Sequence, residues 1–217
     1  MSTLRLFLLN TVLFPGMELP LHVFEERYKQ LVAECLTSGE PFGVALIRDG
    51  QEVGDRTADP HLVGCTARIE QAAPTEGGRI MVEARGEQRF RILDLNDGHP
   101  YRSATVEYPV DELTEVPASL LARAAEGYRQ IIRLRALGEG TYEREIPVPP
   151  APGELADRIA TAASGMVEPA RMQTVLEAFD VHRRLEAVLE FLGPVVEAHH
   201  AEARVAVARR FPFERMN

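Results

Sequence analysis

Lys29 is the only lysine in the 217 residues, and every other strongly basic side chain is an arginine. Any reaction that needs a lysine amine, as a nucleophile or as the base that activates a serine, would have to use Lys29. Lys29 falls in a predicted helix, where a charged side chain is expected to face solvent. The sequence therefore predicts no lysine-dependent catalytic site.

The six histidines are scattered and do not follow a metal-binding pattern. His199 and His200 are adjacent, so a helix would direct their side chains about 100° apart, away from a shared ligand position. Glu197 and Glu202 lie nearby, but we interpret this stretch as a solvated helix face and not as a surface metal site. We expect no metal ion and no cofactor.

Two further groups of titratable side chains could do acid–base chemistry. His182 and Glu186 are four residues apart, which predicts a surface contact on one helix. Glu25 and Glu26 fall in the first turn of a predicted helix, where negative charge complements the helix dipole. Neither pair is typical of general acid–base catalysis, so we predict no catalytic residues.

The overall composition narrows the class of protein. A net charge of −9 argues against a nucleic-acid-binding module, because phosphate contacts require clustered lysine and arginine. No apolar run has membrane-spanning length, and no signal-peptide cleavage site follows the apolar residues 6–9. Cys35 and Cys65 are isolated within apolar patterns, which favours reduced core thiols over a disulfide. We expect a cytoplasmic protein that does not bind a membrane.

We expect the rest of the chain to be organised around one stretch, residues 6–28, LFLLNTVLFPGMELPLHVFEERY. Apolar residues on both faces of 6–9 predict a strand that is covered on both sides. Pro15 and Gly16 fit the two central positions of a type II turn. A helical stripe begins at Phe24 and ends at Gly39. A strand, a proline-rich crossover and a helix are thus expected to pack on one core.

Residues 1–112 predict a β-rich domain. Apolar residues alternate in several short segments, and 63–85 is typical of a hairpin, after which Gly86 is expected to begin a further strand. About six short strands and one helix favour a closed or nearly closed barrel over a parallel βαβ sheet.

Residues 113–217 predict a helical domain, because the apolar period changes from 2 to 3.6 near residue 110. Pro117 and Pro169 suit helix starts, and Asp180 suits a helix cap. The pair Gly193–Pro194 predicts a kink or a break in the last helix. The predicted fold class is α+β, with a β pseudo-barrel and one helix followed by a bundle of four helical segments.

Several stretches, in register over nearly the whole chain, resemble the amino-terminal (LON) domain of the ATP-dependent Lon proteases. They are LNTVLFPGMELPLHVFEERY at 9–28, VGCTARIE at 63–70, VEARGEQRFRILDL at 82–95, LADRIATAA at 155–163 and MQTVLEAFDVHRRLEAVLEFL at 172–192. The family's strand-glycine-x-x-arginine pattern is matched by Gly86 and Arg89. The resemblance implies a PUA-like pseudo-barrel followed by a helical bundle, and a role in recognising and holding polypeptide substrates.

Two activities of full-length Lon proteases lack their residues in this sequence. A phosphate-binding P-loop would end in Gly-Lys-Ser or Gly-Lys-Thr, and the chain contains no Gly-Lys dipeptide. A serine–lysine protease pair would have to use Lys29. We therefore expect neither ATPase nor protease activity.

The leading hypothesis is a non-enzymatic module that binds unfolded or client polypeptide segments. Its partners would be these clients or a separate protease or ATPase. The sequence leaves open whether the chain forms a homo-oligomer. The candidate peptide-binding residues lie in the 13–23 crossover, although each also fits a plain core position: Leu13, Phe14, Met17, Leu19 and Val23. An RNA-binding protein is the alternative, because PUA-like barrels resemble RNA modules, but the acidic composition opposes it. A hydrolase with an unrecognised site is opposed by the absence of a triad or metal spacing.

Overall fold

The structure is a computed structural model that describes residues 2–55, 57–96, 98–112, 114–138, 141 and 145–210, the last twelve of these by their backbone alone. The chain forms two compact units, Met1–Glu112 with Pro169–Phe179 and Leu113–Glu168 with Asp180–Asn217. The division into domains of residues 1–112 and 113–217 stays a prediction. Each unit is described by itself below.

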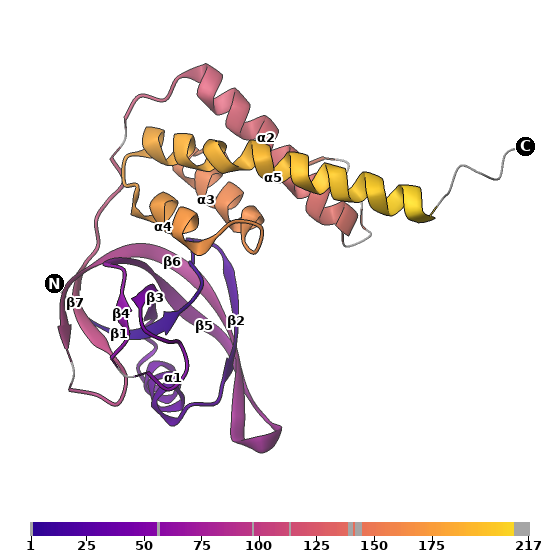
Figure 1. Ribbon diagram of the computed structural model, residues 1–217. Coiled ribbons are helices and arrows are strands. Elements are labelled where there is room, and N and C mark those ends of the chain that lie inside the picture. Colours follow the sequence, from indigo (N-terminus) through magenta and orange to yellow (C-terminus); the bar gives the residue numbers. More distant parts are fainter. Residues whose placement is uncertain are drawn as a thin grey trace, which may run out of the picture. The chain divides into compact units, whose positions relative to one another are not determined.

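Five strands of the first unit form a ring (Figure 1). β1 (Ser2–Leu9) pairs in parallel with β3 (Phe42–Asp49) and antiparallel with β7 (Ser103–Glu107). β6 (Arg79–Asn96) joins β7 to β5 (Val63–Thr75), and β5 pairs with β3 to close the ring. Two strands lie outside it: β4 (Asp59–Pro60) pairs with β3, and β2 (Glu18–Val23) pairs with the first half of β6. The predicted pseudo-barrel is confirmed.

Both faces of β1 are covered, as its two apolar faces predict. Leu6 and Leu8 lie in the interior of the ring with Phe90 and Val106. On the other face, Phe7 stacks on Tyr28 of α1 (Glu26–Ser38), with ring centroids 3.8 Å apart. The predicted end of this helix at Gly39 is also confirmed, since Gly39 adopts φ 69° and caps it.

Gly86 does not begin a new strand, because β6 runs without interruption through it. Its N–H donates to the carbonyl of Met17 (2.9 Å), and its carbonyl accepts from the N–H of Gly16 (2.8 Å). A Cβ at Gly86 would lie only 2.2 Å from the carbonyl oxygen of Phe14. The glycine therefore permits close backbone approach of the crossover to β6, which explains its presence inside a strand.

The turn that approaches Gly86 has the predicted geometry. Gly16 has φ 79°, and the N–H of Met17 donates to the carbonyl of Phe14 (3.1 Å). These are the features of a type II turn with Pro15 and Gly16 at its centre. A 3-10 turn, η1 (Glu76–Gly78), closes the predicted hairpin of β5 and β6 (Figure 1).

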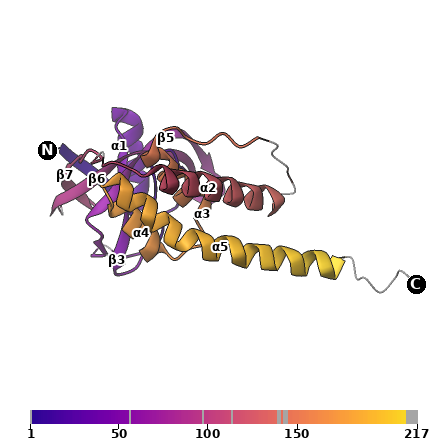
Figure 2. The same ribbon diagram turned by 90° about the horizontal axis from the view of Figure 1, so that it is seen from above.

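The second unit is built from α2 (Ala118–Gly138), α3 (Pro152–Ala163) and α5 (Val181–Arg210), which pack on one another (Figure 2). Asp180 caps α5 as predicted, because its carboxylate accepts from the N–H of Arg183 (3.0 Å). The possibility of a break at Pro194 is wrong. A proline removes one backbone hydrogen bond, and the helix continues through it to Arg210.

The remaining helix, α4 (Pro169–Glu177), packs with the strands of the first unit. The side chain of Gln173 donates to the carbonyl of Val63 on β5 (2.9 Å). Arg89 on β6 is buried and donates through Nε to the carbonyl of Leu176 (2.9 Å). The glycine and the arginine of the 86–89 motif thus each hold another segment against β6: Gly86 the crossover, Arg89 the end of α4.

Candidate functional site

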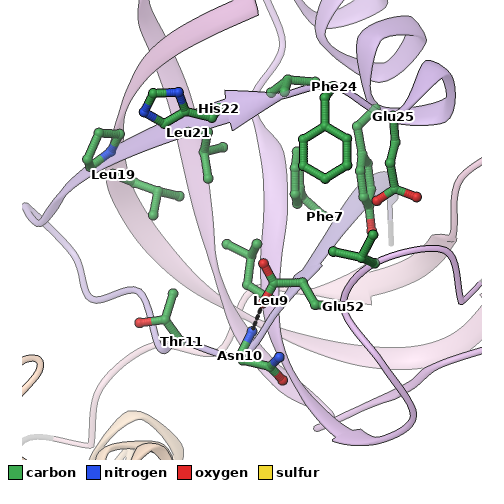
Figure 3. A pocket seen from close by; sticks show the side chains of 14 residues that line it. Phe7, Leu9, Asn10, Thr11, Leu19, Leu21, His22, Phe24, Glu25 and Glu52 are labelled. Carbon is green, nitrogen blue, oxygen red and sulfur yellow. Dashed lines mark hydrogen bonds between the residues drawn. The ribbon is translucent and has the colours of Figure 1, made fainter. Parts of the chain in front are cut away.

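A groove of about 470 Å³ lies in the first unit between β2 and the end of β1 (Figure 3). Its walls are the end of β1 with the two residues after it, β2 from Leu19 to Val23, the start of α1, and residues 52–53. Most lining side chains are apolar, including Phe7, Leu9 and Leu21. This combination of an apolar concave surface with a few polar groups is typical of binding sites.

The alternation of β2 decides which of its side chains form the wall of the groove. Leu19, Leu21 and Val23 are buried, whereas Pro20 and His22 are exposed. Figure 3 shows Leu21 pointing toward the groove and the His22 ring pointing away from it. The strand thus presents an apolar face to the interior and a polar one to solvent, as expected for an antiparallel strand at a sheet edge.

One edge of β2 is unpaired, since among the described strands it pairs only with β6. The N–H of Gly86 donates to the carbonyl of Met17, so the main-chain groups of Met17 are directed toward β6. In an antiparallel pair, every second residue along the strand is directed toward its partner in this way. Leu19, Leu21 and Val23 therefore face β6 with their main-chain groups, and Glu18, Pro20 and His22 face the free edge. Pro20 has no N–H, which removes one donor from this edge and protects it against uncontrolled pairing.

Aromatic rings form the end of the groove nearest α1. Phe7 and Tyr28 are stacked at an interplanar angle of 8°, and the guanidinium of Arg27 lies 4.4 Å from the centroid of Tyr28. Burial raises the pKa of the Tyr28 hydroxyl. At the rim, Phe24 and Val53 leave 48% and 57% of their surface exposed. Large apolar side chains exposed at the rim of an apolar groove are a feature of binding surfaces.

Arg27 fixes the segment 52–55, which forms one side of the groove. Its Nη1 donates to the carbonyl of Asp55 (2.7 Å), and its Nη2 donates to the carbonyl of Glu52 (3.3 Å). Nε and Nη2 also donate to the two oxygens of Glu25 (3.1 and 3.2 Å), and Glu25 in turn accepts from the N–H of Gly54 (3.2 Å). A planar guanidinium can serve these acceptors together, which a lysine could not do.

Glu52 joins the segment 52–55 to the end of β1. Its Oε2 accepts from the main-chain N–H of Asn10 at 2.7 Å, the interaction drawn as a dashed line in Figure 3. The N–H of Asn10 lies just beyond the last residue of β1, where strand pairing has ended. The carboxylate thus replaces a strand partner for this donor and brings a negative charge into the groove.

The structure separates the five candidate peptide-binding residues into three groups. Leu19 and Val23 are buried and line the groove, Leu13 and Phe14 are buried core residues outside its lining, and Met17 is half-buried beside the turn. Their role in binding a peptide stays a prediction.

Of the groove-lining residues, the sequence indicated only Leu19 and Val23 as candidates for binding; the ones it missed include Glu52, Val53 and Phe24. Glu52 and Val53 belong to a stretch that reads as a polar loop, so their contribution depends on long-range packing. For Phe24, the one available signal was its position at the start of the helical stripe, just before Glu25.

Titratable groups elsewhere are engaged in structural contacts. Nζ of Lys29 lies 2.7 Å from Oε1 of Glu26, and Nε2 of His182 lies 3.5 Å from Oε1 of Glu186, as its spacing predicts. Cys35 and Cys65 are buried, and burial raises the pKa of the Cys35 thiol to about 11, which makes it a poor nucleophile.

Within the described ranges, no three His, Cys, Asp or Glu side chains come together as a metal site would require. The side chains of His199 and His200 lie outside the described residues. No helix in the described part of the chain has the length and apolarity needed to cross a bilayer.

Curated relatives match most of this chain but only part of their own length. The Lon protease of Paraburkholderia phytofirmans is 30% identical over 194 residues, which cover 87% of this chain and 24% of that protein. The Lon protease of Roseiflexus castenholzii is 35% identical over 189 residues, covering 84% of this chain and 23% of that protein. The chain thus spans about a quarter of the length of these relatives.

Solved structures support the same relationship. A Lon N-terminal domain protein from Xanthomonas campestris superposes with a TM-score of 0.65 at 27% identity, covering 88% of this chain and 99% of that one. The N-terminal domain of Mycobacterium avium complex Lon protease also gives a TM-score of 0.65, at 19% identity, which supports the fold alone. Finally, the family model described as "ATP-dependent protease La (LON) substrate-binding domain" matches residues 3–193. The chain belongs to the Lon substrate-binding domain family.

Proposed function

We propose that this chain recognises polypeptides and binds an extended, apolar segment of a client protein in the groove beside β2. The observation that carries the proposal is the apolar groove bounded by an unpaired strand edge, with Phe24 and Val53 exposed at its rim. Membership of a substrate-binding family supports the proposal independently of this geometry.

Strand addition is the binding mode that suits this edge. An incoming segment would hydrogen-bond to the outward main-chain groups of β2, and its alternate side chains would enter the groove. Because Pro20 contributes no donor, the edge offers N–H groups only at Glu18 and His22. Main-chain bonding alone would then be weak, and affinity would depend on apolar side chains that reach Leu21 and Phe7.

No bond-breaking step belongs to this proposal. The groove residues form no nucleophile–base pair, and the amine of Lys29 is engaged with Glu26. The protein would hold a client segment, either alone or for delivery to a separate protease or ATPase. Degradation of casein by the purified protein, with or without ATP, would contradict this view.

The test is fluorescence anisotropy with a labelled, permanently unfolded protein. Phe24→Asn and Val53→Asn replace an apolar rim side chain by an uncharged polar one without disturbing buried residues, and each is expected to weaken binding about tenfold. Leu62→Asn is the matched control, because Leu62 is 53% exposed in the same unit but does not line the groove. Equal affinity of the three variants and the wild type would refute this location for the site.

A further inference from the structure

We infer that the groove prefers client segments that carry a cationic side chain, arginine or lysine, next to their apolar residues, and that Glu52 is the residue that selects it. This inference rests on the function proposed above and specifies the chemical class of segment bound. It follows from the distribution of charge around the groove.

Two acidic side chains line the groove. They are Glu25 and Glu52, and the lining contains no lysine or arginine. The lining also contains one histidine, His22, whose ring points to solvent on the exposed face of β2 (Figure 3).

Glu25 is already neutralised. Both of its carboxylate oxygens accept from the guanidinium of Arg27, at 3.1 and 3.2 Å, and Oε2 also accepts from the N–H of Gly54. The other donors of Arg27 reach the main-chain carbonyls of Glu52 and Asp55. All three guanidinium nitrogens of Arg27 thus donate within the protein, and Arg27 is not among the residues that line the groove.

Glu52 is not neutralised in the same way. Among the described residues, its side chain makes one hydrogen bond, in which Oε2 accepts from the N–H of Asn10, and it forms no ion pair there. Within the described part of the chain, no donor reaches its second oxygen, Oε1, which can therefore accept from a bound segment. Figure 3 shows the carboxylate reaching from the 52–55 segment toward Asn10, between the loop and the end of β1.

The surroundings strengthen the effect of this charge. Glu52 is half-buried beside Phe7 and Leu9, and a charge at an apolar, concave surface has a stronger field than one in bulk water. A guanidinium or ammonium that reaches Oε1 would gain a charge-assisted hydrogen bond. A carboxylate at the same place would be repelled. The groove therefore combines apolar affinity with selection by charge.

Peptide binding to the intact chain tests the inference. Three fluorescent peptides, blocked at both ends, would share one apolar core and differ at one flanking position, which is Arg, Gln or Glu. We expect the Arg peptide to bind about fivefold more tightly than the Gln peptide, and the Glu peptide to bind most weakly. The advantage of the Arg peptide should shrink as salt is raised from about 50 to about 500 mM, because the Debye length shortens and screening increases.

Glu52→Gln isolates the residue, because its amide carbonyl can still accept from Asn10 while the charge is lost. Glu76→Gln is the control: Glu76 is exposed in the turn between β5 and β6, outside the groove, and the change in net charge is the same. The Arg preference should disappear in Glu52→Gln and persist in Glu76→Gln.

The outcomes separate the two proposals. Equal binding of the three peptides by the wild type, or an Arg preference that survives in Glu52→Gln, would overturn the charge selection and leave the groove as a purely apolar site. Failure of every peptide to bind would instead refute the proposed function, and the inference with it.

Discussion

Gly86→Ala tests whether the crossover before β2 depends on close contact with β6. The new methyl group would lie 2.2 Å from the carbonyl oxygen and 3.0 Å from the carbonyl carbon of Phe14. These are backbone atoms of a buried residue, so they cannot rotate away as the end of a flexible side chain could. The turn at Pro15–Gly16 must move away from β6, or β6 must bend.

The expected cost combines two contributions. Forcing a methyl group into packed surroundings costs about 1–3 kcal/mol. Separation of the strands also weakens the two hydrogen bonds between Gly86 and the residues Gly16 and Met17, each contributing about 1 kcal/mol. We therefore expect the first unit to lose about 3 kcal/mol of stability. With a urea m-value of about 2 kcal/mol/M, its unfolding midpoint would fall by about 1.5 M.

Urea unfolding followed by circular dichroism measures this loss, and hydrogen exchange of β6 peptides assigns it to the first unit, because two compact units can unfold in separate transitions. Gly98→Ala is the matched control, since a Cβ there meets nothing within 4 Å. It should change stability by less than about 0.5 kcal/mol. If both variants unfolded at the wild-type midpoint, the close contact between Gly86 and Phe14 would not contribute to the stability of the first unit.

Two further predictions concern stability. A hydrogen bond from Tyr101, more than any other contact, lowers the pKa of Glu34 from its usual 4.5 to about 2, so the folded state gains stability from this carboxylate above pH 4.5 and loses it as the pH falls toward 2. Tyr101→Phe should thus flatten the fall of the thermal midpoint between pH 5 and 3, and an unchanged slope would contradict this assignment. In the second unit, Arg184 is fully buried, and its Nη1 lies 3.8 Å from Oδ2 of Asp157. Asp157→Ala would leave the buried guanidinium without this carboxylate, so the free energy of unfolding measured in urea should fall by about 3 kcal/mol. A loss of no more than about 1 kcal/mol, which is typical of an exposed ion pair, would contradict this expectation.

The candidate site could be predicted only in part. The 13–23 crossover was identified because it combines apolar residues with proline and glycine, and two of its residues, Leu19 and Val23, line the groove. Apolar character alone did not separate Leu13 and Phe14, which are buried in the core, from residues that border a cavity. The sequence could not indicate this difference, since it depends on which neighbouring segments cover each side chain.

The sequence by itself determined most of the elements and their order, although it divided β6 in two at Gly86. Period-2 alternation, the Pro15–Gly16 turn and the helix end at Gly39 act over a few residues, so local chemistry is sufficient to specify them. It also limited lysine chemistry to Lys29. The tertiary structure alone decided where a groove forms, because β2 pairs with only part of β6 and keeps one free edge. It also decided that Arg27 neutralises Glu25 and not the carboxylate of Glu52, since that choice depends on residues 25 positions apart meeting in space.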